Sequence, residues 1–206
     1  MSIGILGNKV GMTQIFDKKG NVIPVTIIKT SPCIITQIKT EKICGYNAIQ
    51  IGYLEIPSNA KKLTKPELGH FNKVNLQPFK YLKEYKINFN HEYEVGQKIG
   101  LDLFQIGQSV KITGLTIGKG FASNIKRNNF TTGLMTHGSK SHRLQGSVGA
   151  GTSPSRVFPG KKMAGRLGNV KCTIKGLKIV DIDIDENLLI IKGSIPGKAG
   201  NLISIK

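Results

Sequence analysis

Tryptophan is absent from the 206 residues, and cysteine is limited to Cys33, Cys44 and Cys172. An odd, scattered set of cysteines excludes a disulfide framework and has no metal-ligand spacing, so these side chains are expected to be small, buried and reduced. No apolar run reaches the roughly 18 residues of a membrane span, and no basic amphipathic helix is evident. The N-terminal residues lack the charged start and apolar run of a secretory signal. We therefore expect no membrane partner, and a chain that is either made in the compartment where it works or given in its mature form.

Acidic residues are absent between Leu103 and Val180, a window of 78 residues. This window holds 13 of the 30 basic residues and all four arginines, while the 12 acids lie elsewhere. The whole chain carries a formal charge of +18 and has a pI near 9.9. A solvated surface normally mixes both signs, because opposite charges relieve the repulsion between like charges. A polyanion, and specifically a nucleic acid, is therefore expected to supply the missing negative charge.

Short runs rich in Ile, Val and Thr, separated by turn residues, predict strands at both ends of the chain. Residues 57–80 are polar and Lys-rich, and one short helix is expected to begin at Thr64. Pro24 lies inside one strand run and indicates an edge or a bulge. Short strands with regular turns are typical of a small barrel or sandwich, so the chain is predicted to be mainly β. The predicted strands are 2–6, 12–16, 22–29, 33–39, 48–53, 81–89, 110–114, 170–174, 178–184, 188–191 and 202–205.

The stretch 133–168 shows neither helical nor strand periodicity and contains eight glycines in 36 residues. It buries too little apolar surface to offset its own conformational entropy, so it is either disordered alone or ordered by a partner. The prediction is a β core formed by residues 1–117 and 169–206. A basic, Gly-rich extension at 118–168 is inserted between the two halves of that core.

Two motifs in the basic window contain residue types that also serve in catalysis. Residues 114–120 place three residues, rather than the four of a Walker loop, between the first glycine and the Gly-Lys pair. His137 and His142 have no nearby acid or cysteine to complete a metal site or to orient a base. Contact with RNA suits both motifs better, because Ser, His, Lys and Arg donate to phosphate and ribose oxygens. We therefore expect no enzymatic activity, cofactor, metal or small-molecule substrate.

The candidate RNA contacts are side chains that carry positive charge, donate hydrogen bonds or stack on bases. The competing interpretation is a merely solvated charged face, which would normally include acids. Phe121, Phe130 and Phe158 are suited equally to stacking on bases and to packing against the core. Lysine outnumbers arginine 26 to 4, so the remaining arginines are hypothesised to require a planar guanidinium. The candidates are Lys9, Lys119, Lys126, Arg127, Asn129, Phe130, His137, Ser139, Lys140, His142, Arg143, Arg156, Lys161, Lys162 and Arg166.

The opening segment, 7–16, reads Gly-Asn-Lys-Val-Gly-Met-Thr-Gln-Ile-Phe, and 158–165 reads Phe-Pro-Gly-Lys-Lys-Met-Ala-Gly. These and several other segments resemble, in the right order, motifs of the ribosomal protein L3 family of the large subunit. The resemblance covers essentially the whole chain, and residues 150–154 resemble the cyanobacterial and chloroplast branch. Ala150 stands where some bacterial members carry a methylated glutamine, so that modification is not expected here. The other matching segments are 114–127, 136–139, 141–143, and 188–193 with Pro196 and Gly197. Departures from the family pattern are Lys111, Ser123 and Asn128.

The resemblance implies a six-stranded β-barrel of the translation-protein type that carries a long, irregular, basic extension. It also implies that the extension enters 23S-type rRNA toward the peptidyl-transferase centre, that the protein binds early in subunit assembly, and that other large-subunit proteins are its neighbours. A structural, non-catalytic protein that is not a homo-oligomer is expected, in the chloroplast stroma or otherwise in a bacterial cytoplasm. The alternative is a basic protein that compacts DNA or RNA in general.

Overall fold

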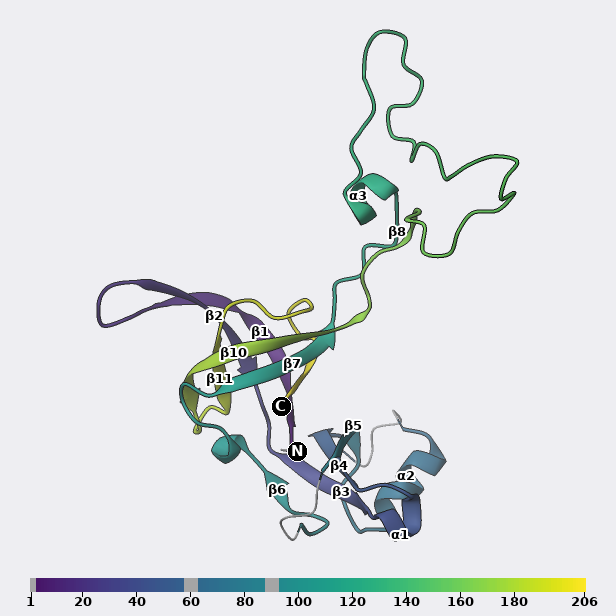
Figure 1. Ribbon diagram of the computed structural model, residues 1–206. Coiled ribbons are helices and arrows are strands. Elements are labelled where there is room, and N and C mark those ends of the chain that lie inside the picture. The colour runs from purple at the N-terminus through teal and green to yellow at the C-terminus, as the bar shows by residue number, and fades with distance from the viewer. Residues whose placement is uncertain (1–2, 58–62, 88–92) are drawn as a thin grey trace. The chain divides into compact units, whose positions relative to one another are not determined.

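The computed structural model describes residues 3–57, 63–87 and 93–206 (Figure 1). The chain forms two compact units. The first, which we call the core unit, comprises Met1–Leu115 and Lys171–Lys206, and the second, the extension unit, comprises Thr116–Val170. Each unit is described below by itself.

Six antiparallel strands of the core unit form a closed barrel in the order β1-β12-β7-β10-β11-β2, and β2 pairs with β1 to complete the ring. The predicted mainly β class with a six-stranded barrel is confirmed. The ladder between β7 and β10 begins at the pair Leu115 and Lys171, so the chain leaves and re-enters the barrel at register partners. The strands are β1 (Ile5–Phe16), β2 (Val22–Lys29), β7 (Ser109–Leu115), β10 (Lys171–Asp183), β11 (Leu188–Lys192) and β12 (Leu202–Ile205).

Two barrel strands are longer than predicted. The separate runs 2–6 and 12–16 belong to the single strand β1, which begins only at Ile5; Ile3 and Gly4 precede it, and Ser2 lies outside the described residues. The runs 170–174 and 178–184 likewise belong to β10, apart from the residues just beyond its ends. Both strands carry register shifts, between Lys9 and Gly11 in β1 and between Ile174 and Leu177 in β10. A bulge inserts a residue and reverses the alternation of inward and outward side chains, so one strand looks like two in the sequence.

A second antiparallel sheet has the order β5-β4-β3-β6 and is not part of the barrel. Sequence periodicity predicted three of its strands but assigned them to one barrel or sandwich. Thr64 is the N-cap of α2, with a capping box to Glu67, which confirms the predicted helix start. Residues 58–62 of the predicted polar segment, and the end of the predicted strand 81–89, lie outside the described residues. The elements are β3 (Cys33–Lys39), α1 (Glu41–Cys44), β4 (Ala48–Glu55), α2 (Lys65–Asn72), β5 (Phe79–Lys86), β6 (Lys98–Ile99) and a 3₁₀ turn (Leu101–Leu103).

Barrel and sheet share one apolar core, in which Ile5, Ile112 and Ile203 from the barrel join Ile35 and Ile51 from the sheet. All five side chains are at most 1 % exposed. At the same contact, the hydroxyl of Tyr85 on β5 lies 2.6 Å from Ser204 Oγ on β12 and donates to the Ile5 carbonyl at 3.2 Å. The core unit therefore has its own hydrophobic core, built from side chains that all lie outside Thr116–Val170.

The cysteines differ from the expectation that all three are buried. Cys33 is fully buried, Cys172 is half-buried and Cys44 is exposed at the end of α1. Burial raises the pKa of the Cys33 thiol to about 11, and the thiolate is the form that reacts with alkylating agents. In native protein at pH 8, we expect iodoacetamide to modify Cys44 rapidly and Cys33 only after denaturation, as followed by peptide mass spectrometry. Modification of both at the same rate would contradict the burial of Cys33.

Candidate nucleic-acid interface

The extension unit begins with a stem formed by residues 116–122 and 165–170. β8 (Phe121–Ala122) pairs with β9 (Gly165–Arg166), and the ladder continues through Lys119 N–H to the Leu167 carbonyl at 2.8 Å. Thr116 N–H donates to the Val170 carbonyl at 3.0 Å at the start of the stem. Gly168 has a φ of +74°, and a Cβ there would lie 2.0 Å from the Ile117 carbonyl oxygen, so only glycine fits. The stem thus holds the first and last residues of the extension unit side by side.

Beyond the stem, a buried amide organises the unit. Asn124 opens the short helix α3 (Asn124–Asn128) and is 3 % exposed. Its Nδ2 donates to Gln145 Oε1 at 2.9 Å and to the Lys162 carbonyl at 3.1 Å, while its Oδ1 accepts from Asn128 Nδ2 at 2.7 Å. We call Asn124, Asn128 and Gln145 the amide cluster. Because the cluster joins α3 to two distant segments, it replaces the hydrophobic core that this unit lacks.

Arg127 adds to the same junction. Its Nη1 donates to the Met163 carbonyl at 2.7 Å, and Asn128 Nδ2 donates to that carbonyl at 3.2 Å. A candidate RNA contact therefore also has a role within the chain, although its side chain stays exposed. Neither this role nor the amide cluster was predicted, because the partners lie 21 to 38 residues apart and leave no periodic signal.

Residues 133–142 form a closed loop. Gly133 N–H donates to the His142 carbonyl at 2.9 Å, and His142 Nδ1 lies 2.8 Å from the Leu134 carbonyl. A carbonyl only accepts, so Nδ1 carries the proton and Nε2 faces away from this bond. A Cβ at Gly133 would lie 2.2 Å from the Ser141 carbonyl oxygen, which makes glycine necessary at the closure. Here His142 positions the loop that carries His137, Ser139 and Lys140.

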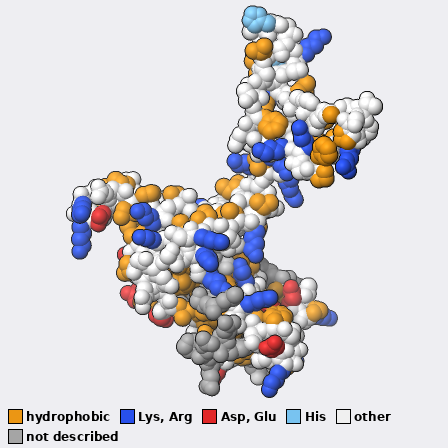
Figure 2. Space-filling model, in the orientation of Figure 1, with side chains coloured by type: hydrophobic (Ala, Val, Ile, Leu, Met, Phe, Trp, Pro, Cys, Tyr) orange, Lys and Arg blue, Asp and Glu red, His pale blue; other side chains and the backbone are white. Residues whose placement is uncertain are grey.

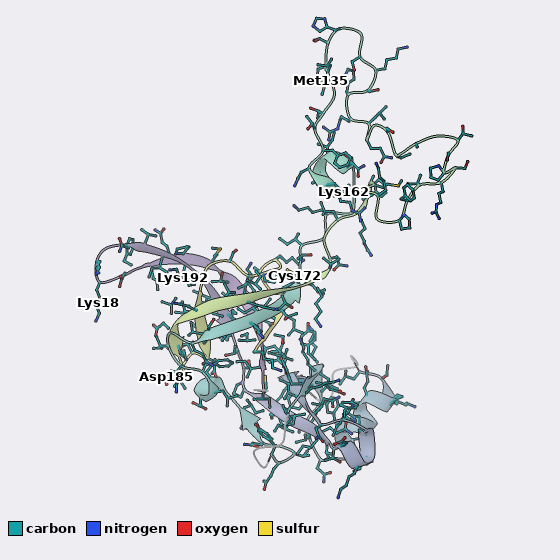
Figure 3. All side chains as sticks on the ribbon, viewed as in Figure 1. Lys18, Met135, Lys162, Cys172, Asp185 and Lys192 are labelled. Atoms are coloured by element: carbon teal, nitrogen blue, oxygen red, sulfur yellow. The ribbon has the colours of Figure 1, made fainter. Side chains whose placement is uncertain are left out.

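Figure 2 shows Lys and Arg side chains over the extension unit, and the sequence of this unit contains no acid. Its basic side chains are all exposed, and none has an acidic partner among the residues described. The guanidinium of Arg156 lies 5.4 Å from the centre of the Phe158 ring, a geometry suited to a planar cation. The Lys162 side chain is labelled in Figure 3, as is Met135 in the loop. These side chains are Lys119, Lys126, Arg127, Lys140, Arg143, Arg156, Lys161, Lys162 and Arg166.

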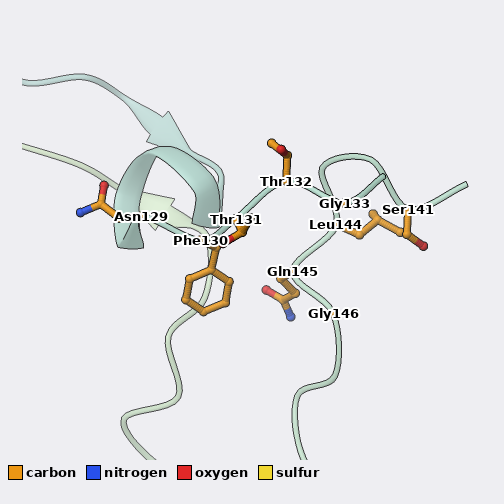
Figure 4. A pocket seen from close by; sticks show the side chains of 9 residues that line it. All are labelled: Asn129, Phe130, Thr131, Thr132, Gly133, Ser141, Leu144, Gln145 and Gly146. Atoms are coloured by element: carbon orange, nitrogen blue, oxygen red, sulfur yellow. The ribbon is translucent and has the colours of Figure 1, made fainter. Parts of the chain in front are cut away.

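A cleft of about 930 Å³ opens between two segments of the extension unit (Figure 4). Two of the candidates, Asn129 and Phe130, lie on one of its sides. Asn129 caps α3 in the left-handed conformation, with a φ of 58°, and this reverses the chain before Phe130. The residues that line the cleft are Asn129, Phe130, Thr131, Thr132, Gly133, Ser141, Leu144, Gln145 and Gly146.

Comparison with known proteins decides the family. A model of the family described as ribosomal protein L3 matches residues 82–187. "Large ribosomal subunit protein uL3c" of Phaeodactylum tricornutum is 60% identical over 205 residues, covering 100% of this chain and 98% of that protein. The chain belongs to the ribosomal protein L3 family. The protein of the same name from Guillardia theta is 54% identical, with 100% of both chains covered. "Large ribosomal subunit protein uL3" of Picosynechococcus is 55% identical, covering 100% of this chain and 96% of that protein.

These relatives confirm the predicted L3 family and its cyanobacterial and chloroplast-type branch. The family consists of structural ribosomal proteins rather than enzymes. No helix of the described residues is long and apolar enough to cross a membrane. The same residues contain no group of three or more His, Cys, Asp or Glu side chains arranged around a metal ion.

The opening L3 motif, residues 7–16, lies along β1. Its Lys9 was predicted as an RNA contact and lies in the core unit, where the predicted bounds of the core also place it. Lys9 Nζ donates to the carbonyl oxygens of Ile195 and Gly197, at 3.0 and 2.8 Å. Two of the three ammonium donors are thus used to hold the loop before β12, and this gives Lys9 a structural role.

Proposed function

We propose that this chain is a structural constituent of the large ribosomal subunit that binds 23S-type rRNA directly through its extension unit. The observation that carries the proposal is the set of nine exposed basic side chains on that unit, which contains no acid. RNA phosphates supply the counter-charge that the protein lacks, and binding releases the cations condensed on the RNA. The names of the relatives, which are large-subunit proteins, support the same setting.

The internal contacts of the extension unit suit a probe that enters folded RNA. The stem is held by backbone hydrogen bonds, the amide cluster by side-chain amides, and the closed loop by a backbone bond and the His142 imidazole. Charged side chains such as Lys126, Lys140 and Arg143 are therefore left for RNA. By this proposal the chain joins the subunit early in assembly, supports the region near the peptidyl-transferase centre and contacts neighbouring ribosomal proteins. It acts in a chloroplast-type or bacterial ribosome, as a single copy and without a cofactor.

The salt dependence of binding tests the proposal. We expect a variant with Lys119, Lys126, Lys140 and Lys161 changed to Gln to bind 23S-type rRNA more weakly. The slope of log affinity against log salt should fall by roughly 0.7 to 0.9 for each phosphate that the variant no longer neutralises. Filter binding at several salt concentrations measures both quantities. The matched control changes four exposed lysines of the core unit, Lys18, Lys19, Lys42 and Lys73, to Gln, with the same change of net charge. Lys18 lies at the turn between β1 and β2 (Figure 3).

An equal slope in the extension variant and the parent chain would contradict the phosphate contacts. Competition with duplex DNA in the same assay separates the alternative function, general compaction of nucleic acids. A compacting protein would lose its rRNA to DNA at equal phosphate concentration, whereas a protein specific for 23S-type rRNA would retain it.

A further inference from the structure

The cleft of the extension unit has a lining unlike the rest of this unit. None of its lining residues is charged, although basic side chains follow or precede them in the sequence. Figure 4 shows the ring of Phe130 and the amide of Gln145 facing each other across the opening. A flat aromatic surface on one side and an amide on the other offer stacking and hydrogen bonding without ion pairing.

The contacts of the amide cluster fix which end of the Gln145 amide faces the cleft. Asn124 donates to the Lys162 carbonyl, which only accepts, so the atom of Asn124 at that position must be its NH₂ group. The same NH₂ group also donates to Gln145, and this makes the contacting atom of Gln145 its oxygen. The Gln145 oxygen is therefore engaged, and the NH₂ group of Gln145 remains as a donor for a ligand. Because Asn124 is 3 % exposed and bonded on both sides, this orientation is set before a ligand arrives.

We propose that this cleft receives a single unpaired nucleobase of the rRNA, stacked on Phe130 and accepting a hydrogen bond from the Gln145 NH₂ group. The inference rests on the proposed function, because it takes rRNA as the partner. Unpaired bases present a flat π-face to aromatic side chains and an edge with acceptor atoms to amides. Exposed cations at Lys126, Arg127 and Arg143 lie close in sequence to the cleft residues and are available for the phosphates of that nucleotide. The cleft thus adds a base contact to an interface that is otherwise made to phosphates.

The test compares three variants of the full-length chain. Phe130→Leu removes the ring, Phe130→Tyr keeps it, and Phe158→Leu removes an exposed ring of the same unit that does not line the cleft. We expect Phe130→Leu to weaken binding to 23S-type rRNA by about tenfold, the typical effect of removing one stacked base. The salt slope should stay unchanged, because the basic side chains still neutralise the same phosphates. Phe130→Tyr should bind like the parent chain, whereas Phe158→Leu, whose ring faces the Arg156 guanidinium, is the control for the crosslink described next.

Ultraviolet crosslinking in assembled large subunits supplies a second readout. We expect the peptide that contains Phe130 to crosslink to one nucleotide, and this crosslink to be absent in Phe130→Leu and present in Phe158→Leu. Parent-like affinity of Phe130→Leu, or a crosslink from Phe130 to another protein, would overturn the base site. In that case the salt-dependent binding of the basic side chains would still stand. If the parent chain bound rRNA with no salt dependence at all, the proposed function itself would fail, and with it this inference.

Discussion

Replacing residues 116–170 by the dipeptide Asn-Gly is expected to leave a folded barrel that has almost no affinity for rRNA. Leu115 and Lys171 are partners in the antiparallel ladder between β7 and β10, so a two-residue turn is long enough to join them. Asn-Gly is the preferred sequence for such a turn, because both central residues adopt positive φ. The deletion therefore leaves every strand pair of the barrel intact.

The core unit should keep its stability in this variant. Ala122 is the buried hydrophobic residue that the described part of Thr116–Val170 contributes, whereas the shared core lies in the barrel and the second sheet. We expect the unfolding midpoint to shift by a few degrees at most. Affinity for 23S-type rRNA at low salt should fall by roughly a thousandfold or more, because the cations that neutralise the phosphates are gone.

Thermal unfolding by circular dichroism and filter binding over a salt series measure the two effects. The control is a chain with a Gly/Ser linker of the original length between Leu115 and Lys171. It keeps the length of the inserted segment and removes its basic side chains, so it separates the effect of length from that of charge. Loss of the folded barrel in the Asn-Gly variant would show that the extension contributes to the core. Retention of the parent affinity and salt slope would instead remove the extension as the RNA-binding part.

Asn124→Ala should have the largest effect of any single substitution in the extension unit. It deletes the donations to Gln145 and Lys162 and leaves the Asn128 amide without its acceptor at Asn124. At about 1 kcal/mol for each hydrogen bond, the local free energy of opening should fall by about 2 to 3 kcal/mol. Hydrogen exchange read by mass spectrometry should show faster exchange in peptides from residues 123–163, with no change in the barrel strands.

Two further variants make this result specific. Asn128→Ala removes its bonds to Asn124 and to the Met163 carbonyl and should give a smaller effect. Thr132→Ala, at an exposed position in the same unit, should leave exchange unchanged. If Asn124→Ala exchanged like the parent chain, the amide cluster would not be what holds the unit together. Affinity for rRNA should also fall in Asn124→Ala, because binding must then order a looser chain.

The fold was predicted where local pattern determines it. The run 22–29 and the run 202–205 have the bounds of β2 and β12, since apolar and β-branched residues bounded by turn residues are visible in the sequence. The bulges of β1 and β10 were missed, because an inserted residue interrupts the regular order of side chains along one strand. The separation of the four-stranded sheet from the barrel was missed for another reason. Periodicity identifies a strand but not its neighbour, and pairs such as Ile51 and Lys83 depend on the tertiary fold.

The candidate site was predicted from charge, and its internal order was not. The absence of acids predicted an exposed basic surface, since charge composition is a property of the sequence alone. Asn124 and Gln145 carry no such signal, because an amide looks the same whether it is solvated or buried. The glycines of the extension were interpreted as a sign of irregular chain, whereas Gly133 and Gly168 are required by contacts with the chain's own carbonyl groups. Lys9 shows the converse, a basic side chain whose contacts are internal.

The pairing of Leu115 with Lys171 has a mechanical consequence. Any pull on the extension, for instance while the surrounding RNA compacts, reaches β7 and β10 together at two bonded neighbours. The two strands are then drawn in the same direction, and the ladder between them bears little load. The force acts instead on the antiparallel ladders that join β7 to β12 and β10 to β11. It is directed along the strands, so the several hydrogen bonds of each ladder resist it together. The barrel thus holds the extension in place, and the pulling force is shared between two strand ladders instead of one.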